Sequence, residues 1–140
     1  MAEVCSGLER VVLVNSHLEP EQLRTLRTLG LPLLDVTRRA SAERLTDEFR
    51  AGAGHAGRYE TSLVLADRPE LVDRGRMRTL EAKMIDMPAA IRSGKTSFVA
   101  MGMDQAYAGA PAEATAEEGE QTFEALAEML VELIREVAAA

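Results

Sequence analysis

The fold class is indicated most clearly by the stretch Val11-Val12-Leu13-Val14-Asn15-Ser16-His17-Leu18-Glu19-Pro20. Its first four residues are apolar and mostly β-branched, which is typical of a short strand buried on both faces of a parallel sheet. Pro20 suits the first turn of a helix, because a missing N–H costs little at that position. The stretch therefore predicts a strand that passes through a polar connection into a helix.

The residues that follow complete a strand–helix–strand unit. Leu23 and Leu26 continue at helical spacing, Gly30 provides a stop, and residues 31–36 form a second apolar run. Short connections between the three elements predict a parallel strand pair with a right-handed crossover. The sequence thus indicates an α/β protein.

Further elements are expected along the rest of the chain. Ser41 is expected to cap a short helix that runs to Phe49, residues 51–57 are glycine-rich and predict a loop, and a helix is expected over 59–66. Residues 73–112 are mixed, with a short helix expected near 87–92.

The clearest element is the C-terminal helix. Thr115 and Glu118 have the spacing of a capping box. An apolar stripe at helical spacing then indicates core or a subunit interface; it comprises Phe123, Leu126, Ala127, Leu130, Leu133, Ile134 and Val137.

Charge and composition exclude several classes of function. The 140 residues carry a net charge of -7 and no basic cluster long enough to follow a phosphate backbone, so we expect no nucleic-acid binding. No apolar run approaches membrane-spanning length, and the start, Met1-Ala2-Glu3-Val4, lacks the pattern of a signal peptide. We therefore expect one cytoplasmic domain with no membrane contact.

The two histidines each lie beside a carboxylate. His17 and Glu19 follow the first strand, at the end where ligands bind in open α/β sheets. In extended backbone their alternation points both side chains the same way. Imidazole and carboxylate are suitable ligands for zinc or manganese. A second interpretation stays open, in which Asn15 or Glu19 only caps the following helix.

His55 lies in the stretch Gly54-His55-Ala56-Gly57-Arg58-Tyr59-Glu60-Thr61-Ser62. A histidine that titrates near neutral pH can transfer a proton, and glycine neighbours let backbone approach a ligand closely. Glu60 could orient His55 or bind a helix partner. The alternative is a loop histidine without a catalytic role.

Together the two stretches resemble the creatininase (creatinine amidohydrolase) family. Family members carry V-L-V-N-G-H at the end of a strand, where this chain has Val12-Leu13-Val14-Asn15-Ser16-His17. They later carry H-[AG]-G-x-x-E-T-S and P-E-L-V or P-D-L-V segments, which match residues 55–62 and 69–72 here. The resemblance extends over nearly the whole chain, including the region that starts the C-terminal helix.

The resemblance implies a three-layer α/β/α fold with a mostly parallel sheet, in a single domain over residues 1–140. It also implies hydrolysis of a C–N bond in a cyclic or linear amide, with a divalent metal, zinc, manganese or iron, as cofactor. His17 and Glu19 match metal ligands, and His55 matches the catalytic histidine. Glu60 matches the glutamate of the same motif, which implies a supporting catalytic role.

One departure shapes the remaining expectations. The family's E-x-H-G-x-H-x-P motif, which supplies further metal ligands, does not occur in this chain. The chain thus resembles the C-terminal part of a family member, with an incomplete sheet. We expect a homo-oligomer or a complex with a complementary subunit that carries the other half, unless the chain is a fragment of a longer protein that contains that half itself. An inactive binding or structural subunit is the alternative.

Overall fold

The structure is a computed structural model and describes residues 10–140. Expectations that rest on Met1–Val4 lie outside the described residues. Within them, the fold starts with the predicted strand–helix–strand unit, formed by β1 (Leu13–Asn15), α1 (Pro20–Thr28) and β2 (Leu33–Asp35). The two strands are parallel, and Leu13 pairs with Leu33 and Asn15 with Asp35. The α/β class is therefore confirmed, with strands shorter than the apolar runs suggested.

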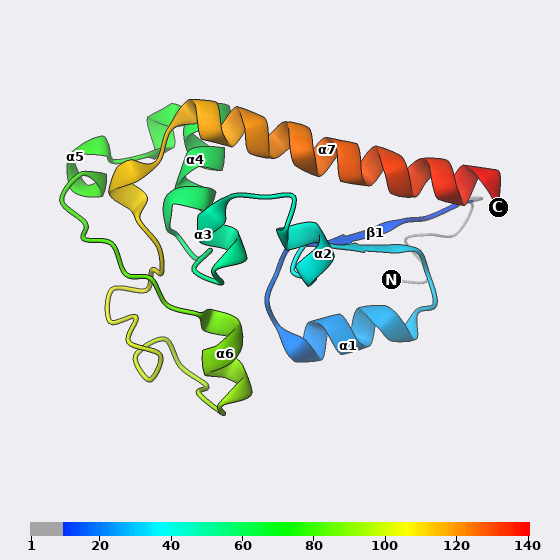
Figure 1. The fold of residues 1–140 in the computed structure, drawn as a ribbon, viewed down its shortest axis with the longest axis horizontal. Helices are drawn as coiled ribbons and strands as arrows, with labels where there is room; N and C mark the ends of the chain where they lie inside the picture. Colours follow the sequence, from blue (N-terminus) through cyan, green and yellow to red (C-terminus); the bar gives the residue numbers. More distant parts are fainter. Residues whose placement is uncertain (1–9) are drawn as a thin grey trace.

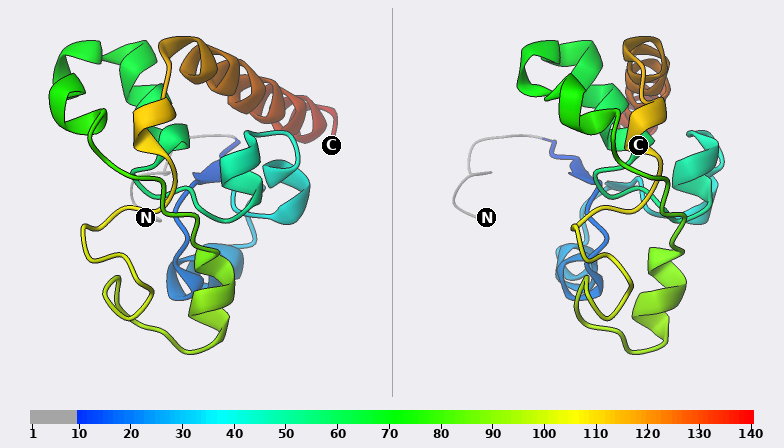
Figure 2. Two further views of the ribbon diagram at one scale, coloured as in Figure 1. Left: turned by 60° about the vertical axis from the view of Figure 1, so that its left-hand side comes forward. Right: turned by 90° about the vertical axis from the view of Figure 1, so that its left-hand side faces the viewer.

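Helices lie on both sides of this strand pair. α7 (Ala116–Ala139) lies on one side and α1 on the other, so that the strands lie between them (Figures 1 and 2). This arrangement agrees with the expected layers. In the part of the chain that the structure describes, however, the sheet has only two strands.

The segment after β2 differs from the expected single helix. It forms two short helices, α2 (Arg39–Ala42) and α3 (Asp47–Arg50). The prediction that Ser41 caps the helix was wrong: the Ser41 hydroxyl lies inside α2 and donates to the carbonyl of Asp35. Thr46 is the actual cap, and its hydroxyl accepts from the N–H of Phe49.

The middle of the chain follows the sequence more closely. α4 (Arg58–Asp67) and α6 (Met87–Arg92) match the expected helices, and between them lie the 3-10 helix η1 (Pro69–Leu71) and α5 (Arg74–Met77). A second 3-10 helix, η2 (Pro111–Glu113), precedes α7. Figure 1 shows α6 and the irregular segment after it at the end of the molecule away from α7.

α7 begins at the predicted cap and packs mainly on α4. The hydroxyl of Thr115 accepts from the N–H of Glu118, which is one half of the predicted capping box. The other half does not form, because the N–H of Thr115 donates to the Ser62 hydroxyl and the Glu118 carboxylate pairs with Arg58. The two helices approach so closely that a Cβ on Gly119 would overlap the backbone of Ser62. The buried positions of α7 are therefore Gly119, Thr122 and Met129. Leu126 packs against the core, whereas Phe123 and Ile134 of the predicted stripe stay about half exposed.

The core is divided into small clusters. Val36, Leu45, Tyr59 and Met129 join β2, the α2–α3 turn, α4 and α7. A second cluster, built from Ala53, Met87, Met103 and Ala108, lies beneath the loop that carries His55. No helix in residues 10–140 has the length and apolar character needed to cross a membrane.

Candidate functional site

One large cleft contains all four residues that the sequence singled out. It has a volume of about 1180 Å³, and His17, Glu19, His55 and Glu60 are among its lining residues. Ser16 follows β1, and Thr37 follows β2, so the carboxyl ends of both strands open into this cleft. This is the place where open α/β sheets bind ligands.

His17 and Glu19 lie on the exposed connection between β1 and α1. Both side chains face solvent at the cleft wall. Glu19 is the N-cap of α1, and its Oε1 accepts from the N–H of Glu21 at 3.2 Å. The capping interpretation is thus realised for Glu19. The same side chain still lines the cleft beside His17.

A buried amide holds the backbone at His17 in place. Asn15 is 3% exposed, and its Nδ2 donates to the carbonyl of His17 at 3.1 Å and to Oδ1 of Asp35 at 3.2 Å. Gln22 of α1 donates to the Oδ1 of Asn15 at 3.0 Å. The network therefore ties the end of each strand to α1 and fixes the start of the His17 connection.

Asp35 carries the negative charge of this network. Its Oδ1 accepts from the N–H and hydroxyl of Thr37 as well as from Asn15. Its buried Oδ2 has no hydrogen-bond partner, but the Arg27 guanidinium lies 3.6 Å away. That cation offsets the cost of burying a carboxylate.

His55 is held from both sides of its backbone. Its N–H donates to the carbonyl of Ala108 at 3.3 Å, and its carbonyl accepts from the N–H of Ala108 at 2.7 Å. This antiparallel bridge anchors the loop to a segment more than fifty residues away. The imidazole contacts the ring of Phe98, with centroids 4.6 Å apart. Phe98 also lines the cleft and stays 40% exposed.

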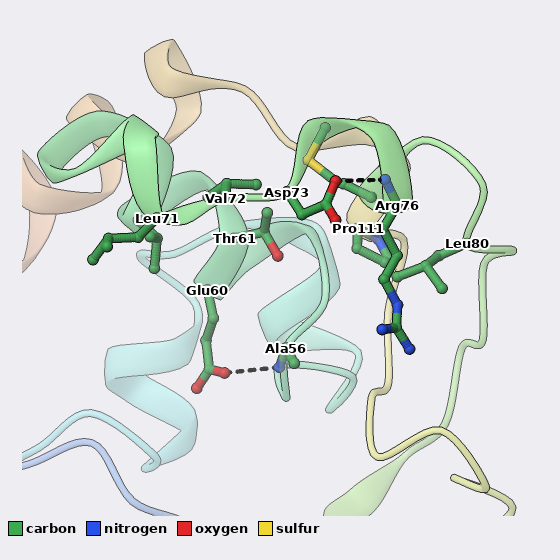
Figure 3. Close-up of a pocket in the computed structure, with 11 residues that line it drawn as sticks. Ala56, Glu60, Thr61, Leu71, Val72, Asp73, Arg76, Leu80 and Pro111 are labelled. Atoms are coloured by element: carbon green, nitrogen blue, oxygen red, sulfur yellow. Dashed lines mark hydrogen bonds between the residues drawn. The ribbon is translucent and has the colours of Figure 1, made fainter.

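Glu60 stabilises the loop rather than pairing with a distant helix. Its Oε2 accepts from the N–H of Ala56 at 2.7 Å, a contact drawn in Figure 3. Ala56 has a positive φ of 49°, which is unusual for a residue with a side chain, and the carboxylate helps hold it there. Glu60 also lines a second, open hollow of about 350 Å³. Figure 3 shows Glu60 together with Leu71 and Leu80, which line the same hollow.

Tyr59 connects α4 to the core beside this loop. The side chain is 4% exposed, and its ring lies 4.5 Å from that of Phe49. Burial, and to a smaller extent the charge of Glu60, raises the pKa of Tyr59 to about 12. The phenol thus stays neutral throughout the physiological range.

Several lining residues were not identified from the sequence. Phe98 and Met101 contribute apolar surface, and Asp86 caps α6 through the N–H of Ala89. The charged groups on the wall are of both signs; they include Glu43, Asp86, Arg39, Arg50, Arg92 and Lys95. The Asp86-x-Pro88 cap pattern was the one available signal, whereas nothing local distinguishes Phe98.

The described residues do not by themselves fit a metal centre. A zinc site takes three or four protein ligands. In residues 10–140 no three His, Cys, Asp or Glu side chains are grouped so that they could hold an ion. The structure thus places His17 and Glu19 at one cleft as two candidate donors and adds no third.

The fold and cleft define an α/β protein in which a parallel strand pair opens into a histidine- and carboxylate-lined cavity. The family model described as "Creatininase: Creatinine amidohydrolase" matches residues 4–134. The chain therefore belongs to the creatininase family. Searches among curated proteins and among solved structures gave no significant match.

Proposed function

We propose that this chain is part of a metal-dependent amidohydrolase that hydrolyses a C–N bond in a small cyclic or linear amide. The main observation in support is that one cleft is lined by His17, Glu19, His55 and Glu60. Family membership supports the same reaction class. The substrate is expected to lie in the cleft, with its amide group near the imidazole of His55.

His55 is the proposed proton carrier. Amide hydrolysis requires a proton on the departing nitrogen, and imidazole is the side chain best suited to deliver it near neutral pH. Two backbone hydrogen bonds to Ala108 limit the positions that this side chain can reach. Phe98 covers one side of the ring and reduces its contact with water. Glu60 is proposed to support catalysis by holding the loop at Ala56.

His17 and Glu19 are the proposed metal ligands of this chain. Because residues 10–140 supply no group of three ligands, we propose that residues outside this range complete the site. They belong to a complementary subunit, to another copy of the chain or to a further part of a longer protein. Exposed apolar side chains support association: Val14 on β1 is 54% exposed, and Phe123 and Ile134 on α7 are 44% and 46% exposed.

Hydrolysis assays test this proposal directly. Creatinine, a formamide and a dipeptide amide are incubated with the wild-type chain and excess Zn²⁺ or Mn²⁺, and ammonia or amine release is measured. The His55→Ala and His17→Ala variants are the matched tests, because both remove an imidazole from the cleft. If another copy of the chain completes the site, we expect turnover that both variants abolish. If a complementary segment completes it, we expect the same result only after that segment is added. Turnover that survives either substitution contradicts the assigned roles.

A catalytically inactive binding or structural subunit is the second candidate. The observation that favours it is the missing third ligand in the described residues. It predicts that the chain hydrolyses none of these amides and retains neither ion after dialysis. Sedimentation velocity adds an independent check on association: a monomer at all concentrations contradicts completion of the site by another copy of the chain.

A further inference from the structure

The buried carboxylate of Glu48 lies outside the cleft but contacts the segments that hold His55. Glu48 belongs to α3 and is only 3% exposed. Its Oε1 accepts from the N–H of Tyr59 at 2.8 Å, and its Oε2 accepts from the N–H of Ala110 at 2.6 Å. One carboxylate thus joins α3, the start of α4 and the segment that precedes η2.

The backbone around Glu48 is shaped to admit this carboxylate. A Cβ on Gly57 would lie 2.6 Å from Oε1 of Glu48, and a Cβ on Gly109 would overlap the carboxylate even more closely. Gly109 also has a φ of +128°, which side-chain-bearing residues rarely adopt. The space at Gly109 is therefore filled by the Glu48 carboxylate, and the space at Gly57 by that carboxylate together with the carbonyl of Ala108.

Glu48 also replaces a missing helix cap. Gly57 is the N-cap of α4 and has no side chain to accept from the first turn. Glu48 accepts from Tyr59, the second residue of the helix, and places a negative charge at the positive end of the helix dipole. The cap thus comes from a different helix, and it orients the start of α4 relative to α3.

His55 and its bridge partner Ala108 belong to the two backbone segments that Glu48 joins. Ala108, its bridge partner, is two residues before Ala110, and Gly57 is two residues after His55. We propose that Glu48 is a positioning residue that fixes the His55 backbone, and hence its imidazole, in the cleft. This inference rests on the proposed function, because the position of His55 matters for catalysis only if His55 transfers a proton.

NMR spectroscopy tests this role without an activity assay. The chain has two histidines, so the Hε1 signals of His55 and His17 serve as probe and internal control. In Glu48→Gln we expect the His55 signal to shift as its contact with Phe98 changes. The His17 signal should stay in place. The Ala108 amide should exchange with solvent about 10- to 100-fold faster, the factor expected for loss of one hydrogen bond to a charged group.

A matched control separates positioning from loss of stability. Leu65→Ala removes a buried side chain of α4 that belongs to another cluster. It should lower global stability and leave both histidine signals in place. Equal shifts of both signals in Glu48→Gln, or no shift of His55, overturn the proposal.

The wild-type protein provides a test that requires no variant. The amides of Tyr59 and Ala110 should both be strongly protected from exchange, because each donates to a buried carboxylate. Rapid exchange at either amide overturns the proposal even if Glu48→Gln fails to fold. Hydrolysis is measured separately. If Glu48→Gln loses turnover while its His55 signal stays in place, the result counts against a positioning role. If the His55 signal moves in Glu48→Gln but the wild type itself shows no turnover, the result counts only against the proposed function.

Discussion

The two histidines line the same cleft, but the chain supports them in different ways. His55 lies in a loop bridged to Ala108, and the buried Glu48 joins the backbone on both sides of that bridge. His17 lies on an exposed connection that is held mainly through the Asn15 amide. The described chain therefore supports the backbone of the proposed proton carrier through contacts with distant segments, whereas on the proposed metal side it offers two exposed donors.

The largest expected effect comes from a comparison of two glycine substitutions, one beside Glu48 and one after α1. Gly109→Ala should lower the free energy of unfolding by about 2–5 kcal/mol, because it combines a disfavoured φ with overlap onto Glu48. Gly30→Ala, after α1, also has a positive φ but meets nothing within 4 Å, so about 1–2 kcal/mol is expected. Urea denaturation measures both. Equal losses would contradict the tighter packing of the His55 side.

The packing of the His55 side should also produce a pH dependence. Tyr59 has its pKa raised from 10.0 to about 12, so the folded state binds the phenolic proton more tightly than the unfolded state. This contribution is complete below pH 10 and is lost as the pH rises towards 12, a decrease of about 2–3 kcal/mol.

Unfolding by urea at several alkaline pH values checks this prediction. Tyr59→Phe keeps the ring and removes the titrating hydroxyl, so its stability should lack this part of the decrease. If the wild type and Tyr59→Phe lose stability in parallel between pH 10 and 12, the burial of the phenol is not the cause.

A smaller effect is expected on the other side of the cleft. Asn15→Ala removes the donor to His17 and Asp35, and it should cost about 1–3 kcal/mol because buried partners lose their hydrogen bonds. The Hε1 signal of His17 should shift, and that of His55 should not, the reverse of the Glu48→Gln result. A shift confined to His55 would show that the two sides are not separately supported.

The smallest change in stability is expected at Phe98. Its ring is 40% exposed, so Phe98→Ala should alter the free energy of unfolding by no more than about 0.5–1 kcal/mol. The His55 Hε1 signal should nevertheless move, since the ring contact is lost. An unchanged His55 signal would contradict the contact and the proposed shielding of the imidazole.

Local signals in the sequence were enough to predict much of the fold. Pro20 and Gly30 bound α1, the Thr115 cap starts α7, and the short helix expected near residues 87–92 is α6. These features depend on neighbouring residues, which a sequence displays directly. The Ser41 cap failed because that hydroxyl bonds instead to Asp35 across a turn.

The packing around the site could not be predicted in the same way. Glu48 resembles any other glutamate of a short helix, and only its contacts with Tyr59 and Ala110 give it a role. The stripe on α7 only partly lines the core: Leu126 packs there, but the buried positions are Gly119, Thr122 and Met129, because α4 approaches the helix closely at Gly119. Such features depend on residues far apart in the chain.

His17 and Glu19 are the proposed metal donors at the cleft that also contains His55. The most direct test of these donors is Mn²⁺ titration followed by NMR spectroscopy. Paramagnetic Mn²⁺ should broaden the Hε1 signals of both histidines, and Glu19→Gln should reduce the broadening at His55. Broadening of neither histidine, or broadening at His55 that Glu19→Gln leaves unchanged, would contradict the account.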